Sequence, residues 1–254
     1  MAVAAIGPAG ENQVLFANIM FDRYRAAAKT GAGCVMGSKN LKAIAVQGTN
    51  SVTMARPQEV RPLAEELRRR LDINQSRGIA SFAKYGTTFL TTLYNELGCN
   101  SVNNYQDTVF QGVEDIHPDK FVDEFVQHNI SCSVNCPVHC AHHWEIPQGP
   151  YKGEVGSKIE YIIMDSMGMH LGVSDLAAIL HFQNLLNKQG MDATQTGTSI
   201  GLMMELWQRG IITAADTAGT EFEWGDVTGI EETINLIARR EGVGQLLADG
   251  TLAA

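Results

Sequence analysis

The chain has 254 residues, 44% of them apolar, and carries a net charge of −9 from 28 acidic and 19 basic side chains. A chain of this length and composition can bury a sizeable core in one or two domains. It has no long basic block, which excludes nucleic acid as an expected partner. It also has no apolar run of about eighteen residues and no signal-peptide pattern, so we expect no membrane span and predict a cytoplasmic location.

The first 49 residues contain short apolar runs separated by glycine-rich loops, which predicts a small β-rich unit. The sequence predicts strands at residues 2–6, 14–20 and 42–46, a short helix at residues 23–29, and loops at residues 7–12 and 30–40. Glycines in the second loop would let the backbone approach a ligand, and the basic side chains around it would suit phosphate. An ordinary tight connection with surface lysines explains the same loop about as well.

From Pro57 onward the pattern is helical. Pro57 is typical of a helix start, and the apolar face that follows continues to about Asn74. Further helices are predicted at residues 79–97, 118–128, 174–188, 230–240 and 243–249, and one more ends near Arg209, with Ser174 as one N-cap and Asp192 or Thr194 as another. Prolines and glycines predict an ordered loop at residues 144–156. The elements together predict an α+β chain.

Three of the five cysteines lie in the stretch Cys132-Ser-Val-Asn-Cys136-Pro-Val-His-Cys140. Thiolates at such spacing can converge on one soft metal centre, as they do around iron–sulfur clusters. Pro137 is unsuited to a helix interior, so we expect a turn wrapped around the centre. Two alternatives stay open. The cysteines could line a buried helix as small apolar residues, or could bind zinc together with nearby histidines, namely His139, His142 and His143.

Several of these segments together resemble the aldehyde:ferredoxin oxidoreductase family of tungsten enzymes. The resemblance is carried by residues 7–12, by Arg25-Ala-Ala, by residues 31–44, by the cysteine stretch and by residues 187–192. It implies that residues 1–49 are the C-terminal part of a β-rich domain forming the pterin base, and that residues 50–254 are a mainly helical domain. It further implies tungsten, or molybdenum, held by two pterins, with Mg²⁺ at the pterin phosphates and a neighbouring [4Fe–4S] cluster.

The resemblance assigns roles to individual residues. Cys132, Cys136 and Cys140 match the clustered cluster ligands, although the first gap is one residue longer than is usual in the aldehyde enzymes. Arg25, Ala26 and Ala28 match the segment that lies along the pterin, and Lys29 beside them would suit its phosphates. An Asp-x-x-Gly-Leu-Asp motif that binds one pterin corresponds to Asn187, Met191 and Asp192, of which only Asp192 matches the motif.

Two further residues are candidates for proton transfer. Glu160 sits where the family places a glutamate beside the metal, and its apolar sequence neighbours suggest a buried carboxyl. His170, flanked by Met169 and Leu171, is a possible second proton donor. The alternative for Glu160 is a surface or salt-bridged carboxylate, and for His170 a hydrogen-bonded core residue.

The resemblance leaves the reaction open. Oxidation of aldehydes to carboxylates with ferredoxin as acceptor is one possibility. Reductive dearomatisation of an aryl-CoA by the tungsten subunit of a class II benzoyl-CoA reductase, which works with an iron–sulfur electron-transfer subunit, is a nearly equal alternative. It rests on the wider cysteine gap, the His-His-Trp that follows the cysteine stretch, and His170. A non-catalytic iron–sulfur or zinc-binding module is the third. The resemblance implies a fourth cluster cysteine and a second pterin motif beyond residue 254, so we expect a fragment of a longer polypeptide. A homo-oligomer is the expected assembly.

Overall fold

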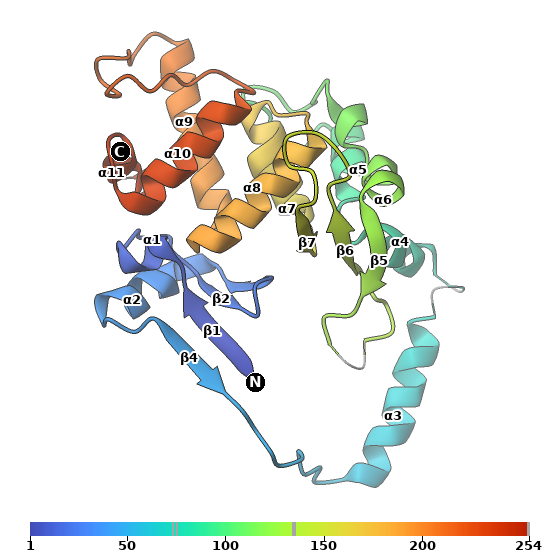
Figure 1. Ribbon diagram of the computed structural model, residues 1–254. Helices are drawn as coiled ribbons and strands as arrows, with labels where there is room; N and C mark the ends of the chain where they lie inside the picture. Colours follow the sequence, from blue (N-terminus) through green and yellow to red (C-terminus); the bar gives the residue numbers. More distant parts are fainter. Residues whose placement is uncertain (73, 75, 134–135, 253–254) are drawn as a thin grey trace.

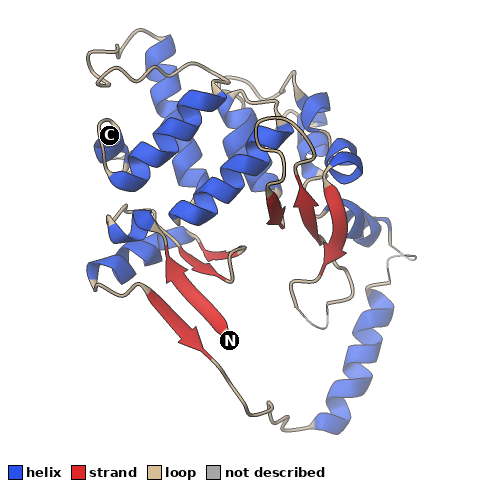
Figure 2. Cartoon of the chain, viewed as in Figure 1, coloured by secondary structure: helices blue, strands red, loops and turns tan. Residues whose placement is uncertain are grey.

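The computed structural model describes residues 1–72, 74, 76–133 and 136–252. Within these residues the strands form two small antiparallel sheets, one four-stranded and one three-stranded, and helices make up most of the remaining regular structure (Figure 1, Figure 2). The predicted α+β class is confirmed. The larger core lies among the C-terminal helices, and the N-terminal sheet packs beneath them in the view of Figure 1.

The N-terminal sheet has the strand order β3-β2-β1-β4. Its strands are β1 (Ala2–Ile6), β2 (Ile19–Phe21), β3 (Arg25–Ala27) and β4 (Ala43–Val46), and its helices are α1 (Pro8–Glu11) and α2 (Ala32–Ser38). The helix predicted at residues 23–29 is wrong, because Asp22 and Arg23 adopt positive φ angles of 47° and 75° and turn the chain back along β2. The strand predicted at residues 14–20 is likewise shorter, and the two predicted loops contain α1 and α2.

A helical segment follows. Helix α3 (Pro57–Arg70) begins at the predicted proline, and none of its side chains is buried. The single helix predicted at residues 79–97 is wrong, because the chain forms α4 (Arg77–Tyr85) and α5 (Leu90–Glu96) with a break at Gly86. Gly86 has a φ of +63°, which an L side chain rarely adopts. Because glycine has no side chain, the Cys140 carbonyl can pack against Gly86. An added Cβ would lie only 2.7 Å from that carbonyl oxygen.

The three-stranded sheet carries the cysteine stretch between two of its strands. Helix α6 (Pro118–Glu124) leads into β5 (Val126–Ile130), which pairs with β6 (Ala141–Glu145), and β6 pairs with β7 (Val155–Ser157). The helix predicted at residues 118–128 therefore ends at Glu124 in the structure. The loop predicted at residues 144–156 contains the end of β6 and the start of β7. Trp144 is fully buried and its indole lies over Gly156, where an added Cβ would approach it to 2.1 Å.

The C-terminal helices form most of the core. A continuous helical stretch contains α7 (Tyr161–Ile163), a π-helical turn η3 (Met164–Gly168) and a 3-10 turn η4 (Met169–Leu171). Next come α8 (Leu176–Gln189), α9 (Ala193–Gln208), α10 (Val227–Arg239) and α11 (Gly244–Leu247); the other 3-10 turns are η1 (Lys29–Gly31) and η2 (Val113–Ile116). Asp192 caps α9, as predicted, whereas α8 is capped by Asp175 rather than Ser174. These helices bury a cluster of methionine, leucine, isoleucine and phenylalanine side chains.

Among the described residues, no single helix has both the length and the apolarity of a membrane span, although the segments Tyr161–Leu171 and Leu176–Gln189, bent by 114°, meet these criteria as a pair.

Candidate active site

The cysteine stretch connects β5 to β6 at the lower end of the three-stranded sheet (Figure 1). Cys132 is exposed, Cys136 and Cys140 are half-buried, and all three are free thiols. Burial raises the pKa of Cys140, and the neighbouring Cys132 and Cys136 sulfurs raise it further. The described residues of the stretch form no helix, which argues against the buried-helix alternative, while Val134 and Asn135 lie outside the described residues. Thiols this close repel as thiolates, and a bound cationic centre would relieve the repulsion.

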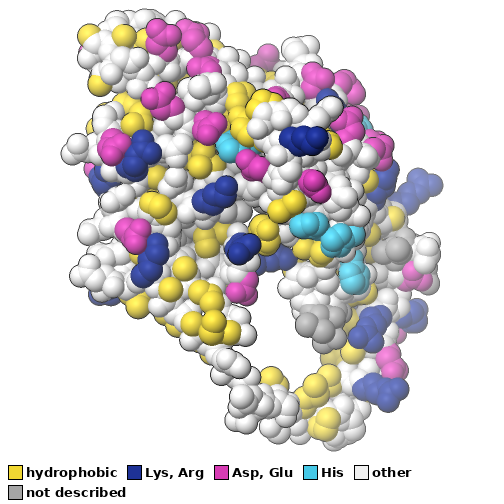
Figure 3. All heavy atoms as spheres, viewed as in Figure 1, with side chains coloured by type: hydrophobic (Ala, Val, Ile, Leu, Met, Phe, Trp, Pro, Cys, Tyr) yellow, Lys and Arg dark blue, Asp and Glu magenta, His cyan; other side chains and the backbone are white. Residues whose placement is uncertain are grey.

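The donor set suits iron, because three cysteine sulfurs lie on one loop. Within the described part of the chain, however, no three His, Cys, Asp or Glu side chains already stand at metal-binding geometry. His142 of the zinc alternative is buried, and its Nε2 is hydrogen bonded to the Lys84 carbonyl at 2.9 Å. Histidine side chains do gather over this sheet (Figure 3), and the rings of His128 and His143 lie 5.0 Å apart. Thiol chemistry therefore fits an iron–sulfur cluster better than the histidines fit zinc.

Glu160 lies in the neighbourhood of the last of these cysteines. Its carboxylate is close enough to Cys140 to contribute to the raised pKa of that thiol. One carboxylate oxygen accepts a hydrogen bond from Thr87 Oγ1 at 2.6 Å, and the other pairs with Lys158 Nζ at 2.6 Å. The side chain is one-third exposed, so the expected apolar surroundings are wrong. The lysine ion pair holds the carboxylate in one orientation next to the cysteine stretch.

The break between α4 and α5 contacts both the cysteine stretch and Glu160. Gly86 packs against the Cys140 carbonyl, and the next residue, Thr87, donates its hydroxyl proton to Glu160. Thr87 Oγ1 also accepts a hydrogen bond from the backbone N–H of Tyr161 at 2.8 Å. Sequence reasoning missed Gly86, Thr87 and Lys158. A glycine within an expected helix was the available signal for the break.

His170 lies apart from this cluster. It is 3% exposed, and its Nδ1 donates to the Ser101 carbonyl at 3.0 Å. Its other ring nitrogen lies against α9, where an added Cβ on Gly201 would approach it to 2.7 Å, and Tyr105 packs edge-on at 5.3 Å between centroids. Burial lowers the pKa of His170. A close-packed imidazole is the arrangement of a core histidine, and its hydrogen-bond and ring contacts among the described residues are with Ser101 and Tyr105 and not with Glu160. Its proton-donor role stays a prediction.

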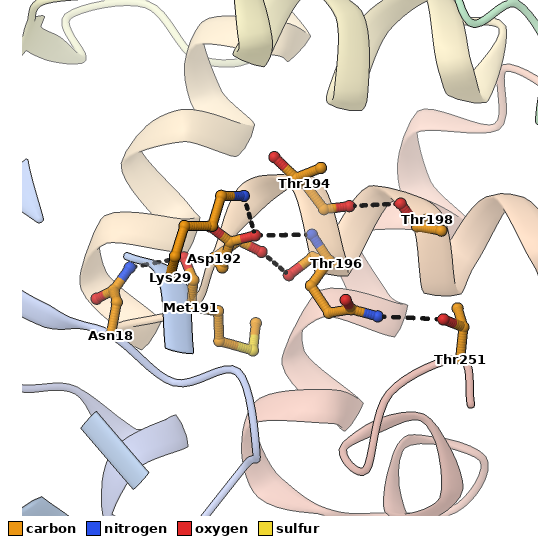
Figure 4. A network of polar contacts seen from close by, with 9 residues as sticks. Asn18, Lys29, Met191, Asp192, Thr194, Thr196, Thr198 and Thr251 are labelled. Carbon is orange, nitrogen blue, oxygen red and sulfur yellow. Dashed lines mark hydrogen bonds and ion pairs between the residues drawn. The ribbon is translucent and has the colours of Figure 1, made fainter. Parts of the chain in front are cut away.

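Asp192 and Lys29 contact each other directly. Lys29 Nζ lies 3.0 Å from Asp192 Oδ1, and the same oxygen accepts the backbone N–H of Gln195 at the start of α9 (Figure 4). The Asp192 side chain is 7% exposed, whereas that of Lys29 is 65% exposed. The pair joins the N-terminal unit to the helical unit, and we call it the Lys29–Asp192 clasp.

Backbone hydrogen bonds reinforce the clasp. The amide N–H of Asp192 donates to the Phe16 carbonyl at 3.1 Å, and the Asn18 side chain donates to the Met191 carbonyl at 2.8 Å (Figure 4). The Met191 side chain is part of the core, with 2% exposure. The loop between α8 and α9 is therefore fixed against residues 16–18, and the ends of both helices face the N-terminal sheet.

The remaining predicted pterin contacts lie on or near an edge strand. Ala26 is exposed on β3, and Arg25 and Ala28 are half-buried. Small residues leave the surface of this edge open to a flat ligand. The turn that precedes them, Asp22–Tyr24, lines a cavity that also reaches Asn187 of α8.

This cavity, which we call the sheet–α8 cavity, has a volume of about 810 Å³. Its apolar wall comes from β1 and β2, and its polar wall from Arg23, Glu154, Asn184, Asn187 and Lys188. Volumes of this size, with mostly apolar walls and a few polar groups, are typical of sites for organic cofactors. The cavity is therefore large enough for an organic cofactor, and two cationic side chains, Arg23 and Lys188, are available to an anionic group.

Comparison with known proteins identifies the family. A family model for the N-terminal domain of aldehyde ferredoxin oxidoreductase matches residues 1–48, and one for domains 2 and 3 matches residues 63–254. The tungsten-containing aldehyde ferredoxin oxidoreductase of Pyrococcus furiosus is 36% identical over 250 residues, covering 98% of this chain and 40% of the relative. The aliphatic sulfonate oxidoreductase, WOR-like subunit, of the same organism is 32% identical over 255 residues. This match covers 100% of this chain and 40% of the relative.

A solved structure is also similar. It is the active-site complex BamBC of benzoyl coenzyme A reductase with 1,5-dienoyl-CoA, which superimposes with a TM-score of 0.74 at 26% identity and covers 99% of this chain and 39% of that one. The chain thus spans about 40% of the length of the curated relatives that it matches. On the family models and these relatives, the chain belongs to the aldehyde ferredoxin oxidoreductase family.

Proposed function

We propose that this chain forms part of a tungsten-pterin, iron–sulfur oxidoreductase that oxidises aldehydes to carboxylates and passes the electrons to ferredoxin. One observation carries the proposal: a carboxylate held by an ion pair, Glu160, lies near the cysteine stretch, because Thr87 binds it while the adjacent Gly86 packs against the Cys140 carbonyl. Oxidising an aldehyde requires a proton acceptor close to a route for single electrons. The sequence relatives, which are named as tungsten-containing aldehyde ferredoxin oxidoreductases, support the same assignment.

The cysteines and Glu160 would have separate roles in this reaction. Cys132, Cys136 and Cys140 would hold the iron–sulfur cluster, which supplies one-electron transfer. The pterin-bound metal supplies two-electron chemistry when bound. Water supplies the second carboxylate oxygen, and Glu160 takes the proton released as water adds to the aldehyde carbonyl, while the Lys158 ion pair and the Thr87 hydrogen bond hold the Glu160 carboxylate in place.

The sheet–α8 cavity would hold one pterin. Arg23 and Lys188 face it and can pair with a phosphate, and Mg²⁺ at that phosphate would reduce the remaining charge. Cys132 is exposed, so a cluster bound by it would lie near the protein surface, where an iron–sulfur electron carrier could approach.

A second candidate is reductive dearomatisation of an aryl-CoA. The similarity to the benzoyl coenzyme A reductase complex favours it, since that match covers 99% of this chain. In this reaction Glu160 would donate protons to the ring instead of accepting one, which the same carboxyl can do when protonated.

The deciding experiment measures turnover of the anaerobically purified full-length protein with both substrate classes. Reduction of a viologen dye by an aldehyde, without reduction of benzoyl-CoA at low potential, is expected for the first function. Activity with benzoyl-CoA and none with aldehydes would show that reductive dearomatisation, and not aldehyde oxidation, is the function. Protein that contains tungsten and iron but turns over neither substrate class would contradict both.

A further inference from the structure

The sheet–α8 cavity contains a carboxylate to which neither the family resemblance nor the comparisons assign a role. Glu154 lies on the loop before β7 and lines the cavity together with Asn184 and Asn187 of α8. The other carboxylate of the lining, Asp22, is exposed and accepts the backbone N–H of Val3. Glu154 is three-quarters buried and is thus the carboxylate best shielded from water in this lining.

Donors on α8 fix the position of this carboxylate. His181 Nδ1 lies 2.7 Å from Glu154 Oε1, and Asn184 Nδ2 donates to Oε2 at 3.0 Å. The His181 ring is itself held by stacking on Tyr151, with centroids 4.0 Å apart and planes 12° from parallel. Its second nitrogen faces Glu231 at 3.5 Å. Each carboxylate oxygen of Glu154 has one donor and keeps a free lone pair.

Such a carboxylate suits one edge of a pterin. The pyrimidine ring of a pterin presents a ring N–H next to an exocyclic amino group, and a carboxylate can accept both in parallel, as it does from a guanidinium. Asn187 on the next turn of α8 is neutral and cannot provide two charged acceptor oxygens. Apolar residues on the opposite wall, such as Ile6 and Met20, leave a flat ring in a partly desolvated setting.

We propose that Glu154, oriented by His181 and Asn184, is the residue that recognises the N–H edge of the pterin in this cavity. The inference rests on the proposed function, because it takes the cavity as the pterin site. It makes Glu154 a binding residue and His181 a positioning residue.

The test is pterin content of the anaerobically purified full-length protein, measured as the fluorescent oxidised pterin released per chain after extensive dialysis. Glu154→Gln should lower it at least tenfold. Glu231→Gln is the matched control, because Glu231 contacts the other nitrogen of His181 and does not line the cavity; it should keep wild-type content. Normal pterin content in Glu154→Gln would overturn the inference, and a wild type without pterin would overturn the proposed function as well.

A second variant separates recognition from folding. Asn187→Asp returns a carboxylate to the same cavity wall, so the double variant Glu154→Gln/Asn187→Asp should recover pterin if the lost group is a pterin acceptor. Recovery is the expected result even where Glu154→Gln alone lowers the melting temperature. A double variant that regains the wild-type melting temperature without pterin, or that regains neither, would show that Glu154 serves only to hold His181, and would contradict the inference.

Discussion

Replacing Asp192 tests how the N-terminal unit is fixed to the helices. Asp192→Ala removes the N-cap of α9 together with the Lys29–Asp192 clasp, whereas Asp192→Asn keeps an oxygen that can accept the Gln195 N–H. Asn caps helices about as well as Asp does. The two variants therefore separate the helix cap from the ion pair.

The structure sets the expected sizes. Loss of an N-cap costs about 1 kcal/mol. The ion pair adds at most about 1 kcal/mol, because Lys29 is 65% exposed and solvent screens its charge. We expect Asp192→Ala to lower the free energy of unfolding by about 1.5 kcal/mol and Asp192→Asn by about 0.5 kcal/mol. Lys29→Met should match Asp192→Asn, since both lose only the pair.

Urea denaturation followed by circular dichroism measures these differences, provided that the slope m is unchanged. Equal losses for Asp192→Ala and Asp192→Asn would show that charge, not capping, dominates. A loss below about 0.3 kcal/mol for Asp192→Ala, well under the usual worth of a cap, would refute the reasoning altogether.

Three other outcomes are expected. Glu160→Gln should lower turnover per tungsten atom by roughly a hundred- to ten-thousand-fold with unchanged iron and tungsten content, as measured by assay and metal analysis; unchanged turnover would remove the proton-transfer role. Ala26→Leu should lower tungsten and pterin content, while Ala27→Leu, on the opposite face of β3, should not; equal metal analyses would count against the edge contact. Burial lowers the pKa of His170, so the unfolded chain binds a proton first as pH falls through about 6.5, and stability present above that pH is lost below it. Denaturation of His170→Asn at several pH values should show a weaker pH dependence, and an identical one would contradict the assignment.

Local signals predicted the elements that local chemistry controls. Pro57 begins α3, Asp192 caps α9, and Gly190 ends α8 with a φ of +74°. Each of these features depends on a residue and its immediate neighbours, so the sequence alone was sufficient.

Elements that depend on tertiary pairing were mispredicted. Residues 25–27 lie in a strand because β2 pairs with them, and residues 126–130 lie in β5 because β6 is adjacent, which no local pattern records. The helix at residues 79–97 breaks where Gly86 meets Cys140, a contact between segments more than fifty residues apart.

The candidate site shows the same division. The cysteine stretch and Glu160 were predicted from the sequence and its family resemblance, and in the structure the adjacent residues Gly86 and Thr87 contact the Cys140 carbonyl and the Glu160 carboxylate. Lys158 and Thr87 were not identified, because their role depends on how the segments meet. Glu154 likewise gains significance only from the cavity that it lines.

The claim that the cysteine stretch holds an iron–sulfur cluster is tested most directly by electron paramagnetic resonance of the dithionite-reduced full-length protein, purified without oxygen. The signal of a reduced [4Fe–4S] cluster is expected in wild type and in Cys99→Ser, whose exposed cysteine lies outside the stretch. It should disappear in Cys136→Ser together with the iron. A wild type without the signal, or a Cys136→Ser variant that keeps both signal and iron, would contradict the account.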